Sequence, residues 1–217
     1  MSQVTSGVEA WRDETIGTAA VKALQKNGFD AIYVADIEEA AKQVMAFIEK
    51  GKTIGFGGSM TIKALRIAEK AQERGAIVLD HNAPGLTPEK KLEILRSQLS
   101  CDVFISGSNA VTLDGYLVNV DYNGNRLAAL TFGPKKAVVV VGTNKIVRNL
   151  QEAQERIETV AAPMNNKRLE KPNPCVRTGI CQDCALETRI CRIYQVLRRR
   201  PALLDFTVIV VGSYLGF

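Results

Sequence analysis

The chain has 217 residues, of which 46% are hydrophobic and 24% are charged, and its formal net charge is +5. This length predicts one domain that buries most of its unfolded surface without disulfides. The first 17 residues contain no apolar core and no apolar run reaches the roughly 18 residues of a membrane span, so we expect a cytoplasmic protein without a signal peptide or membrane contact.

Helix and strand patterns alternate along the first half of the chain. The helices are amphipathic, several of them closed by Gly, and the strands are short apolar runs. This alternation predicts a mostly parallel sheet with helices on both faces, a three-layer α/β/α fold. Helices are predicted at 8–26, 37–50, 61–74 and 88–99, and strands at 31–34, 53–56, 76–79 and 102–106.

The alternation stops in the stretch GYLVNVDYNGNRLAALTFG. It has an apolar run on each side of Asn123-Gly124 and lacks the length for an intervening helix, which predicts a hairpin-like insertion. The remaining predicted elements are an apolar strand at 137–142 for the centre of the sheet, a helix at 150–162 and a buried strand at 206–212.

Two adjacent glycines follow the strand predicted at 53–56. Gly57, Gly58 and Ser59 lead into a helix, an arrangement that aims backbone N–H groups at an anion, and Ser59 and Thr61 could add hydroxyl donors. The spacing is neither that of a P-loop nor that of a dinucleotide site. Two interpretations stay open: a site for phosphate or carboxylate, and a tight turn capped by Ser59.

The single histidine, His81, lies at a predicted strand end in LDHNAPGL. Ligands bind at such ends in open α/β sheets, so His81 could act as a general base and Asn82 as a ligand donor. Adjacent residues on an extended segment point apart, so Asp80 would not automatically orient His81. The alternative is an Asx-type turn leading into Pro84 and Gly85.

Four of the five cysteines lie in NPCVRTGICQDCALETRIC. Zinc and a [4Fe–4S] cluster both accept four thiolates, so the ligand set does not choose between them. Redox-active or disulfide-bonded thiols and unrelated buried thiols are the alternatives. The four candidate metal ligands are Cys175, Cys181, Cys184 and Cys191.

The spacing of these cysteines favours one centre. Cys181 and Cys184 form a CxxC pair, and a helix that begins near Cys184 would place Cys191 two turns later on the same face. The fifth, Cys101, begins a predicted strand, where a small buried residue is expected. Three neighbouring arginines are expected to lower the thiol pKa values: Arg177, Arg189 and Arg192.

The positive charge is concentrated around the cysteines. Residues 164–201 carry nine Lys or Arg against three Asp or Glu, so the rest of the chain is slightly negative. This pattern fits a solvated face around thiolates or a docking surface for an acidic partner. Nucleic acid is not expected, because no aromatic residues are interleaved for base stacking.

Several blocks resemble the LUD (lactate utilisation) family: GFGGSMT, LDHNAPGL, DVFISGSNAVTLDGYLVNVD, RLAALTFGPKKAVVVVGTNKIV and the closing cysteines. The resemblance implies the three-layer fold of ribose-5-phosphate isomerase, glucosamine-6-phosphate deaminase and CoA transferases (NagB/RpiA/CoA-transferase-like). In that fold the loop matched by Gly57, Gly58, Ser59 and Thr61 commonly receives an anion. We therefore expect one LUD-type domain over 1–217, with 165–201 as a cysteine-rich metal-binding excursion.

The resemblance also implies a function. It predicts an accessory component of the oxidation of lactate to pyruvate, and the iron–sulfur partner subunits of the family favour a [4Fe–4S] cluster, with zinc as the alternative. The expected partners are a small anionic metabolite and a redox subunit that docks on the basic cysteine segment. Two other functions stay open: an enzyme acting on a phosphorylated metabolite, and a metal-stabilised interaction module without turnover.

A second similarity concerns the stretch SGSNAVTLDGYLVN. It is similar to a block of methylthioribose-1-phosphate isomerase and of the regulatory subunits of translation initiation factor 2B, where the enzyme carries a catalytic Asp. Asn109 stands at that place, and an amide cannot act as a general base, so this isomerisation is not expected. Asn82, Asn109 and Asn119 are expected to line the ligand site, with His81 and Asp114 as candidate catalytic residues.

Overall fold

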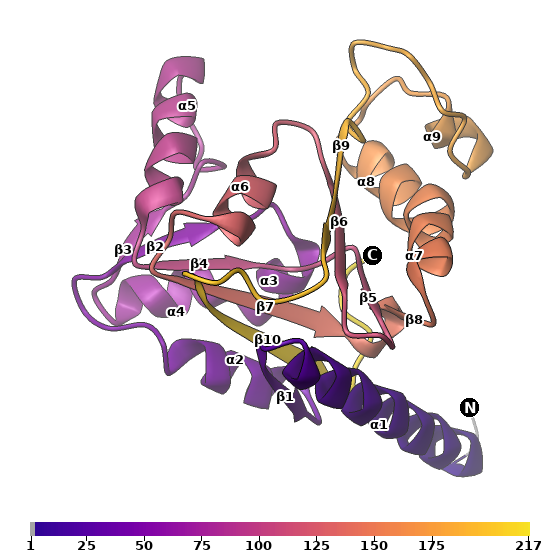
Figure 1. Ribbon diagram of the computed structural model, residues 1–217. Helices are drawn as coiled ribbons and strands as arrows, with labels where there is room; N and C mark the ends of the chain where they lie inside the picture. Colours follow the sequence, from indigo (N-terminus) through magenta and orange to yellow (C-terminus); the bar gives the residue numbers. More distant parts are fainter. Residues whose placement is uncertain (1–2) are drawn as a thin grey trace.

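The computed structural model describes residues 3–217, with side chains from Gly7 onward. Its framework is a six-stranded parallel sheet in the order β1-β10-β7-β4-β2-β3 (Figure 1). These strands are β1 (Asp30–Val34), β2 (Thr53–Phe56), β3 (Ile77–Leu79), β4 (Val103–Ser106), β7 (Lys136–Gly142) and β10 (Asp205–Val211).

Helices cover both faces of this sheet, as the alternation predicts. β7 is apolar from Ala137 onward and is buried on both faces, because Val138 and Val140 point to one face while Val139 and Val141 point to the other. The first face packs against α2 (Ile37–Met45), α3 (Met60–Leu65) and α4 (Ile67–Glu73). The second packs against α1 (Gln3–Lys26) and α6 (Asn125–Thr131), while α5 (Pro88–Ser97) has no buried residue.

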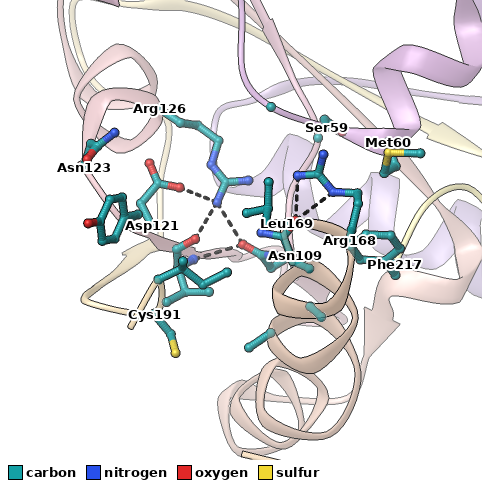
Figure 2. Close-up of a pocket in the computed structure, with 18 of the residues that line it drawn as sticks. Ser59, Met60, Asn109, Asp121, Asn123, Arg126, Arg168, Leu169, Cys191 and Phe217 are labelled. Atoms are coloured by element: carbon teal, nitrogen blue, oxygen red, sulfur yellow. Dashed lines mark hydrogen bonds and ion pairs between the residues drawn. The ribbon is translucent and has the colours of Figure 1, made fainter. Parts of the chain in front are cut away.

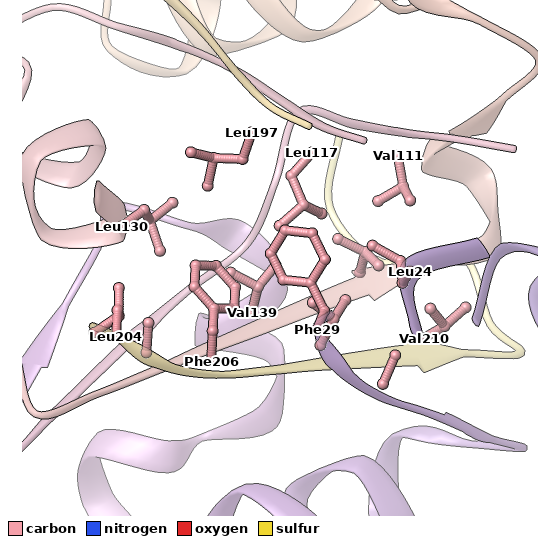
Figure 3. Close-up of a cluster of buried hydrophobic side chains, with 14 of the residues drawn as sticks. Leu24, Phe29, Val111, Leu117, Leu130, Val139, Leu197, Leu204, Phe206 and Val210 are labelled. Atoms are coloured by element: carbon pink, nitrogen blue, oxygen red, sulfur yellow. The ribbon is translucent and has the colours of Figure 1, made fainter. Parts of the chain in front are cut away.

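A small four-stranded sheet lies above the second face, in the order β8-β5-β6-β9. Its side chains pack against the main sheet and complete the core drawn in Figure 3. There Leu117 and Leu197 of the small sheet face Phe29 and Phe206. The rings of Phe29 and Phe206 meet edge to face, with centroids 5.1 Å apart. The strands are β5 (Ala110–Thr112), β6 (Leu117–Asp121), β8 (Ile146–Val147) and β9 (Ile193–Leu197).

A long helical segment covers the outer face of the small sheet. It consists of α7 (Leu150–Arg156), a π-helical turn (Ile157–Ala161) and α8 (Ala162–Arg168). Ala153 and Ile157 pack on Ala110 and Val118 of the small sheet. The helix predicted at 150–162 thus continues past Pro163, which has no N–H to donate, and the wider π turn directly precedes this proline.

The predicted hairpin is displaced along the chain. The turn lies at Asp114-Gly115, between antiparallel β5 and β6, and the apolar stretch after Asn123-Gly124 forms α6 instead of a strand. The helix is favoured because Leu127 and Leu130 are three residues apart and both are buried.

Two other predicted helices differ from the expectation, one by a break and one by an early end. The helix predicted at 61–74 is divided at Arg66, whose φ of 54° is left-handed, into α3 and α4. The helix predicted at 37–50 ends at Met45. The strands predicted for the main sheet are all confirmed to within one residue at either end.

None of the helices found between residues 3 and 217 combines the length and the apolar character that crossing a bilayer requires.

Candidate functional site

A cavity of approximately 370 Å³ opens where the parallel strands of the main sheet end. Ser59 follows β2, Ser108 follows β4 and Lys145 follows β7, and all three line the cavity. The start of α6 and the end of α8 supply the opposite walls through Arg126 and Arg168 (Figure 2). The cavity therefore lies at the edge of the sheet where open α/β folds bind ligands.

The glycine loop forms one wall of this cavity. Ser59 caps α3, because its hydroxyl accepts from the N–H of Ile62 at 3.5 Å, so the predicted cap is present. A Cβ on Gly57 would lie 2.5 Å from Oγ of Ser106, so packing requires this glycine. A Cβ on Gly58 would meet no atom within 4 Å, and Gly58 lines the cavity, so its missing side chain leaves room at the wall.

His81 and Asn82 both line the cavity. The two ring nitrogens of His81 lie 3.0 Å from the amide nitrogen of Gln98 and 3.2 Å from that of Asn82. Burial lowers the pKa of His81, although the charge of Asp80 opposes this change. Asp80 does not orient the ring; its carboxylate accepts from the N–H of Asn82 at 2.8 Å, which is the Asx-type turn considered above.

Basic side chains dominate the lining. Within the part of the chain that the structure describes, Asp121 is the only acidic side chain that lines the cavity. Its Oδ1 lies 2.6 Å from a guanidinium nitrogen of Arg126, so its charge is already compensated. Because Arg126 compensates Asp121, the excess of positive charge comes from Lys91, Arg168, Lys171 and the protonated form of Lys145.

Asn109 holds the Arg126 wall in place (Figure 2). Its Oδ1 accepts from the guanidinium of Arg126 and from the N–H of Val120, each at 3.0 Å, and its backbone oxygen accepts from Arg156. The amide oxygen of Asn109 therefore already accepts two hydrogen bonds from the protein. Asn119 lies behind it, fully buried, and its Oδ1 accepts from the N–H of Asn109 at 3.3 Å.

Lys145 is the most deeply buried cation of the site. It is 3% exposed, and its ammonium group donates to the hydroxyl of Thr61 at 2.9 Å. Thr61 in turn donates to the backbone oxygen of Leu215, so it supports Lys145 from behind and does not itself line the cavity. Burial and the charges of Arg156 and Arg126 lower the pKa of Lys145 to about 7.

Four of the predicted site residues do not line the cavity: Gly57, Thr61, Asp114 and Asn119. Asp114 is exposed in the turn between β5 and β6, where its backbone oxygen accepts from the side chain of Asn27 at the end of α1. Asn119 is enclosed within the small sheet. The sequence analysis did not identify Arg126, Lys145 or Arg168, because single basic residues far apart in the chain form no motif.

The four cysteines of the C-terminal segment gather beside this cavity. Cys175 begins the short helix α9 (Cys175–Thr178), and residues 179–192 form a loop, so the helix expected from Cys184 to Cys191 is absent. The side chain of Arg189 donates to the backbone oxygens of Cys184 and Cys191, at 2.9 and 2.8 Å, and thereby fixes the loop where helical bonds were expected.

A buried polar network anchors the same loop. The amide of Asn173 donates to Oδ1 of Asn166 at 2.6 Å and to the backbone oxygen of Thr188 at 3.0 Å. The hydroxyl of Thr188 donates back to Oδ1 of Asn173 at 2.6 Å. The N–H of Cys181 donates to the backbone oxygen of Glu158 in the π-helical turn. The cysteine loop is therefore attached to α8 and the π turn at several points.

The four thiols are close enough for their charges to interact. Burial raises the pKa of the Cys175 thiol, and the charges of Cys191, Cys184 and Cys181 raise it further. Burial also raises the pKa of Cys191, although Arg189 opposes this change. The expectation that neighbouring arginines lower the thiol pKa values is therefore wrong for these two cysteines, because no arginine lowers the pKa of Cys175 and desolvation outweighs the charge of Arg189 at Cys191.

The thiols fit a metal centre in number and type of donor. All five cysteines are free, and Cys101 is buried against the second face of the main sheet, in a different cluster from Cys191. Among the residues described, however, no three His, Cys, Asp or Glu side chains are arranged at metal-ligand spacing. Thiolate sites often become ordered only when the metal binds, so four neighbouring free thiols are compatible with such a centre.

Comparisons with known proteins identify the family. The fold is similar to the crystal structure of a DUF162 family protein from Deinococcus radiodurans at 1.70 Å resolution, with a TM-score of 0.52 and 15% sequence identity over 92% of this chain and 98% of that chain. A search of curated proteins found no match. The model of the LUD domain matches residues 18–211. The chain therefore belongs to the LUD domain family.

Proposed function

We propose that this LUD domain protein binds a small carboxylate in the cavity and serves as an accessory component of the oxidation of lactate to pyruvate. The observation that carries the binding proposal is the excess of positive charge in a cavity whose only acidic side chain is already paired with Arg126. Charge-assisted hydrogen bonds from such side chains are the strongest that a protein offers a carboxylate. The choice of lactate and pyruvate is supported by the family resemblance.

The main alternative is an enzyme that acts on a phosphorylated small metabolite. The number of basic side chains around the cavity favours it, because a phosphate carries more charge than a carboxylate. His81, which lines the cavity and whose pKa is lowered by burial, would be its candidate base.

Calorimetry with lactate, pyruvate and inorganic phosphate tests the proposal, with lactamide as the uncharged control. Arg168→Gln removes a cavity cation, and Lys167→Gln removes an exposed cation next to it that does not line the cavity. We expect Arg168→Gln to weaken carboxylate binding about tenfold, the equivalent of one charge-assisted hydrogen bond, and Lys167→Gln to leave it unchanged.

The outcomes separate the candidates. Binding of phosphate without lactate or pyruvate favours the phosphorylated metabolite. Binding of none of the three anions contradicts a small-anion site and leaves the interaction module as the remaining function.

We further propose that the four cysteines hold one centre, an iron–sulfur cluster with zinc as the alternative. Cys175, Cys181, Cys184 and Cys191 would hold it, and a cluster would supply electron transfer. Its proximity to the cavity supports this role, because Cys191 contributes to both the thiol group and the cavity wall. The basic residues of 164–201 would then receive an acidic redox subunit, and five free thiols support a cytoplasmic location.

Elemental analysis of protein purified without oxygen tests the centre. Cys184→Ser is expected to lose most of the bound metal. Cys101→Ser alters a thiol buried against the second face of the main sheet and is expected to keep the metal. Retention of stoichiometric metal by Cys184→Ser, or wild-type protein free of both iron and zinc, would show that the thiols serve another purpose.

A further inference from the structure

The side chain of Lys145 is enclosed by four elements. Thr61 belongs to α3, Arg126 to α6 and Arg156 to α7, and a Cβ added to Gly216 of the C-terminal segment would lie 3.4 Å from its amine nitrogen. The one hydrogen bond described for the amine is the bond to Thr61. The amine is thus held at the cavity wall by this bond.

The charges around Lys145 oppose its protonation. Both charged groups that act on it, Arg156 and Arg126, are positive, and within residues 7–217 no acidic side chain forms an ion pair with it. The nearby carboxylate of Asp121 is taken by Arg126. A buried lysine with a purely structural role is normally paired with a carboxylate, so this arrangement calls for another explanation.

A neutral amine in such a place is a nucleophile. Lysines that are desolvated or placed beside another cation are the ones that attack carbonyl carbons in proteins. The lowered pKa of Lys145 agrees with the geometry, because about half of the amine would be unprotonated near neutral pH.

We propose that Lys145 forms a reversible imine with a 2-oxo monocarboxylic acid, such as pyruvate, bound in the cavity. The amine lone pair attacks the ketone carbon, and the carbonyl oxygen takes up a proton to give a carbinolamine. Loss of this hydroxyl as water forms the carbon–nitrogen double bond, so one ketone and one amine become one imine and one water. No oxidant or reductant is required.

The other cations of the cavity supply the selectivity for an acid. Arg126 and Arg168 line the same cavity as Lys145, and the two guanidinium groups, drawn in Figure 2, can hold the carboxylate while Lys145 meets the ketone. A simple ketone without a carboxylate would lack this second contact. The inference rests on the proposed function, because it takes the ligand to be a small carboxylate.

Reductive trapping tests the proposal. Wild-type protein is incubated with pyruvate and cyanoborohydride, which reduces an imine to a stable secondary amine, and intact mass and peptide mapping then locate the modification. We expect a single adduct on Lys145, none with lactate, which has no ketone, and much less with acetone. Labelling should increase as the pH rises through about 7, where the amine loses its proton.

Two variants serve as controls. Lys145→Met should lose the adduct, and Lys167→Met, which alters an exposed lysine of α8, should keep it. The peptide map of the wild-type protein decides the site even if Lys145→Met does not fold.

The outcomes distinguish this inference from the proposed function. Pyruvate that binds in calorimetry without being trapped overturns the imine and leaves the carboxylate site standing. Labelling spread over exposed lysines also overturns it. Absence of both binding and trapping contradicts the two proposals together.

Discussion

Ser59 links two strand ends at the wall of the site. Its hydroxyl caps α3, and a Cβ added to Gly107 would lie 2.6 Å from its Oγ, so one small side chain joins the ends of β2 and β4. The open space at neighbouring Gly58 lies on the cavity side of the same turn.

We predict that Ser59→Asp abolishes binding of small anions while the fold is retained. Asp is a good helix cap, so α3 persists, but its charge would oppose an anion in the same cavity. Calorimetry with the anion that the wild type binds gives the measurement, and circular dichroism checks the fold. Unchanged affinity in a folded Ser59→Asp variant would place the anion away from the loop.

Lys145 makes the stability of the fold depend on pH. The ordinary pKa of lysine is 10.5, and in the folded protein it is lowered to about 7. Between these values the unfolded chain binds a proton that the folded chain does not, so the free energy of unfolding rises with pH across this window. Below the lower value the cost of burying the ammonium is fully present, at most on the order of 5 kcal/mol.

We therefore predict that Lys145→Met is more stable relative to the wild type at about pH 6 than at about pH 10. Loss of the hydrogen bond to Thr61 lowers the stability of the variant by the same amount at both values, so the difference between them isolates the titration. Urea unfolding at the two pH values measures it. Lys167→Met, exposed on α8, should show the same offset at both.

Asn173 anchors the cysteine loop to the rest of the protein. It is 2% exposed, two residues before Cys175, and its side chain joins Asn166 of α8 to Thr188 of the cysteine loop. No other side chain in the described part of the chain makes this link. The position of the loop therefore depends on a buried amide.

We predict that Asn173→Ala destabilises the protein by about 1–3 kcal/mol, because buried partners at Asn166 and Thr188 lose their hydrogen bonds. The loop 179–192 should also become sensitive to limited proteolysis. Gln182→Ala, an exposed change within that loop, should alter neither property. Equal protease resistance in Asn173→Ala would mean that the cysteine segment is held by other contacts.

The elements predicted from the sequence were those with strong local signals. The strands of the main sheet were recognisable because each is a short apolar run buried on both faces, as Val138 to Val141 show. The segment that forms α6 was misread, because its apolar run is short enough to suit a strand or a helix. The Asp114-Gly115 turn did carry a hairpin signal, which the Asn123-Gly124 pair obscured.

The site was only partly predictable for a related reason. Ser59, His81 and Asn109 lie in recognisable stretches at strand ends, and all three line the cavity. Lys145 and Arg126 reach it from distant segments, and nothing in their local sequence distinguishes them from surface cations. The cysteine loop could not be predicted as a loop, since the side-chain bonds of Arg189 that shape it depend on the final fold.

At the scale of the whole molecule, the contact between α1 and the small sheet depends on one glycine. Gly115 has a φ of 78°, and a Cβ there would lie 2.4 Å from the backbone carbon of Ala23 in α1. Gly85 has the same φ, but a Cβ there would meet nothing within 4 Å. The two glycines therefore share backbone strain and differ in packing.

We predict that Gly85→Ala costs about 1 kcal/mol, the cost of a left-handed conformation in a residue with a side chain. Gly115→Ala should cost at least about 3 kcal/mol, since α1 must move away from the small sheet. Thermal or urea unfolding compares them directly. Similar losses in both variants would show that the helix shifts freely at this contact.

The order of strands in the main sheet also affects how the protein is made. β1 pairs only with β10, and β10 lies between β1 and β7, although it is the last strand of the chain to be synthesised. A nascent chain on the ribosome can pair β7, β4, β2 and β3. β1 has no pairing partner, and α1 no complete surface to pack on, until β10 has emerged as far as Val211. α1 and β1, although they precede the other strands of this sheet in the chain, are thus among the last to dock, and we expect their apolar side chains to be a binding site for chaperones during translation.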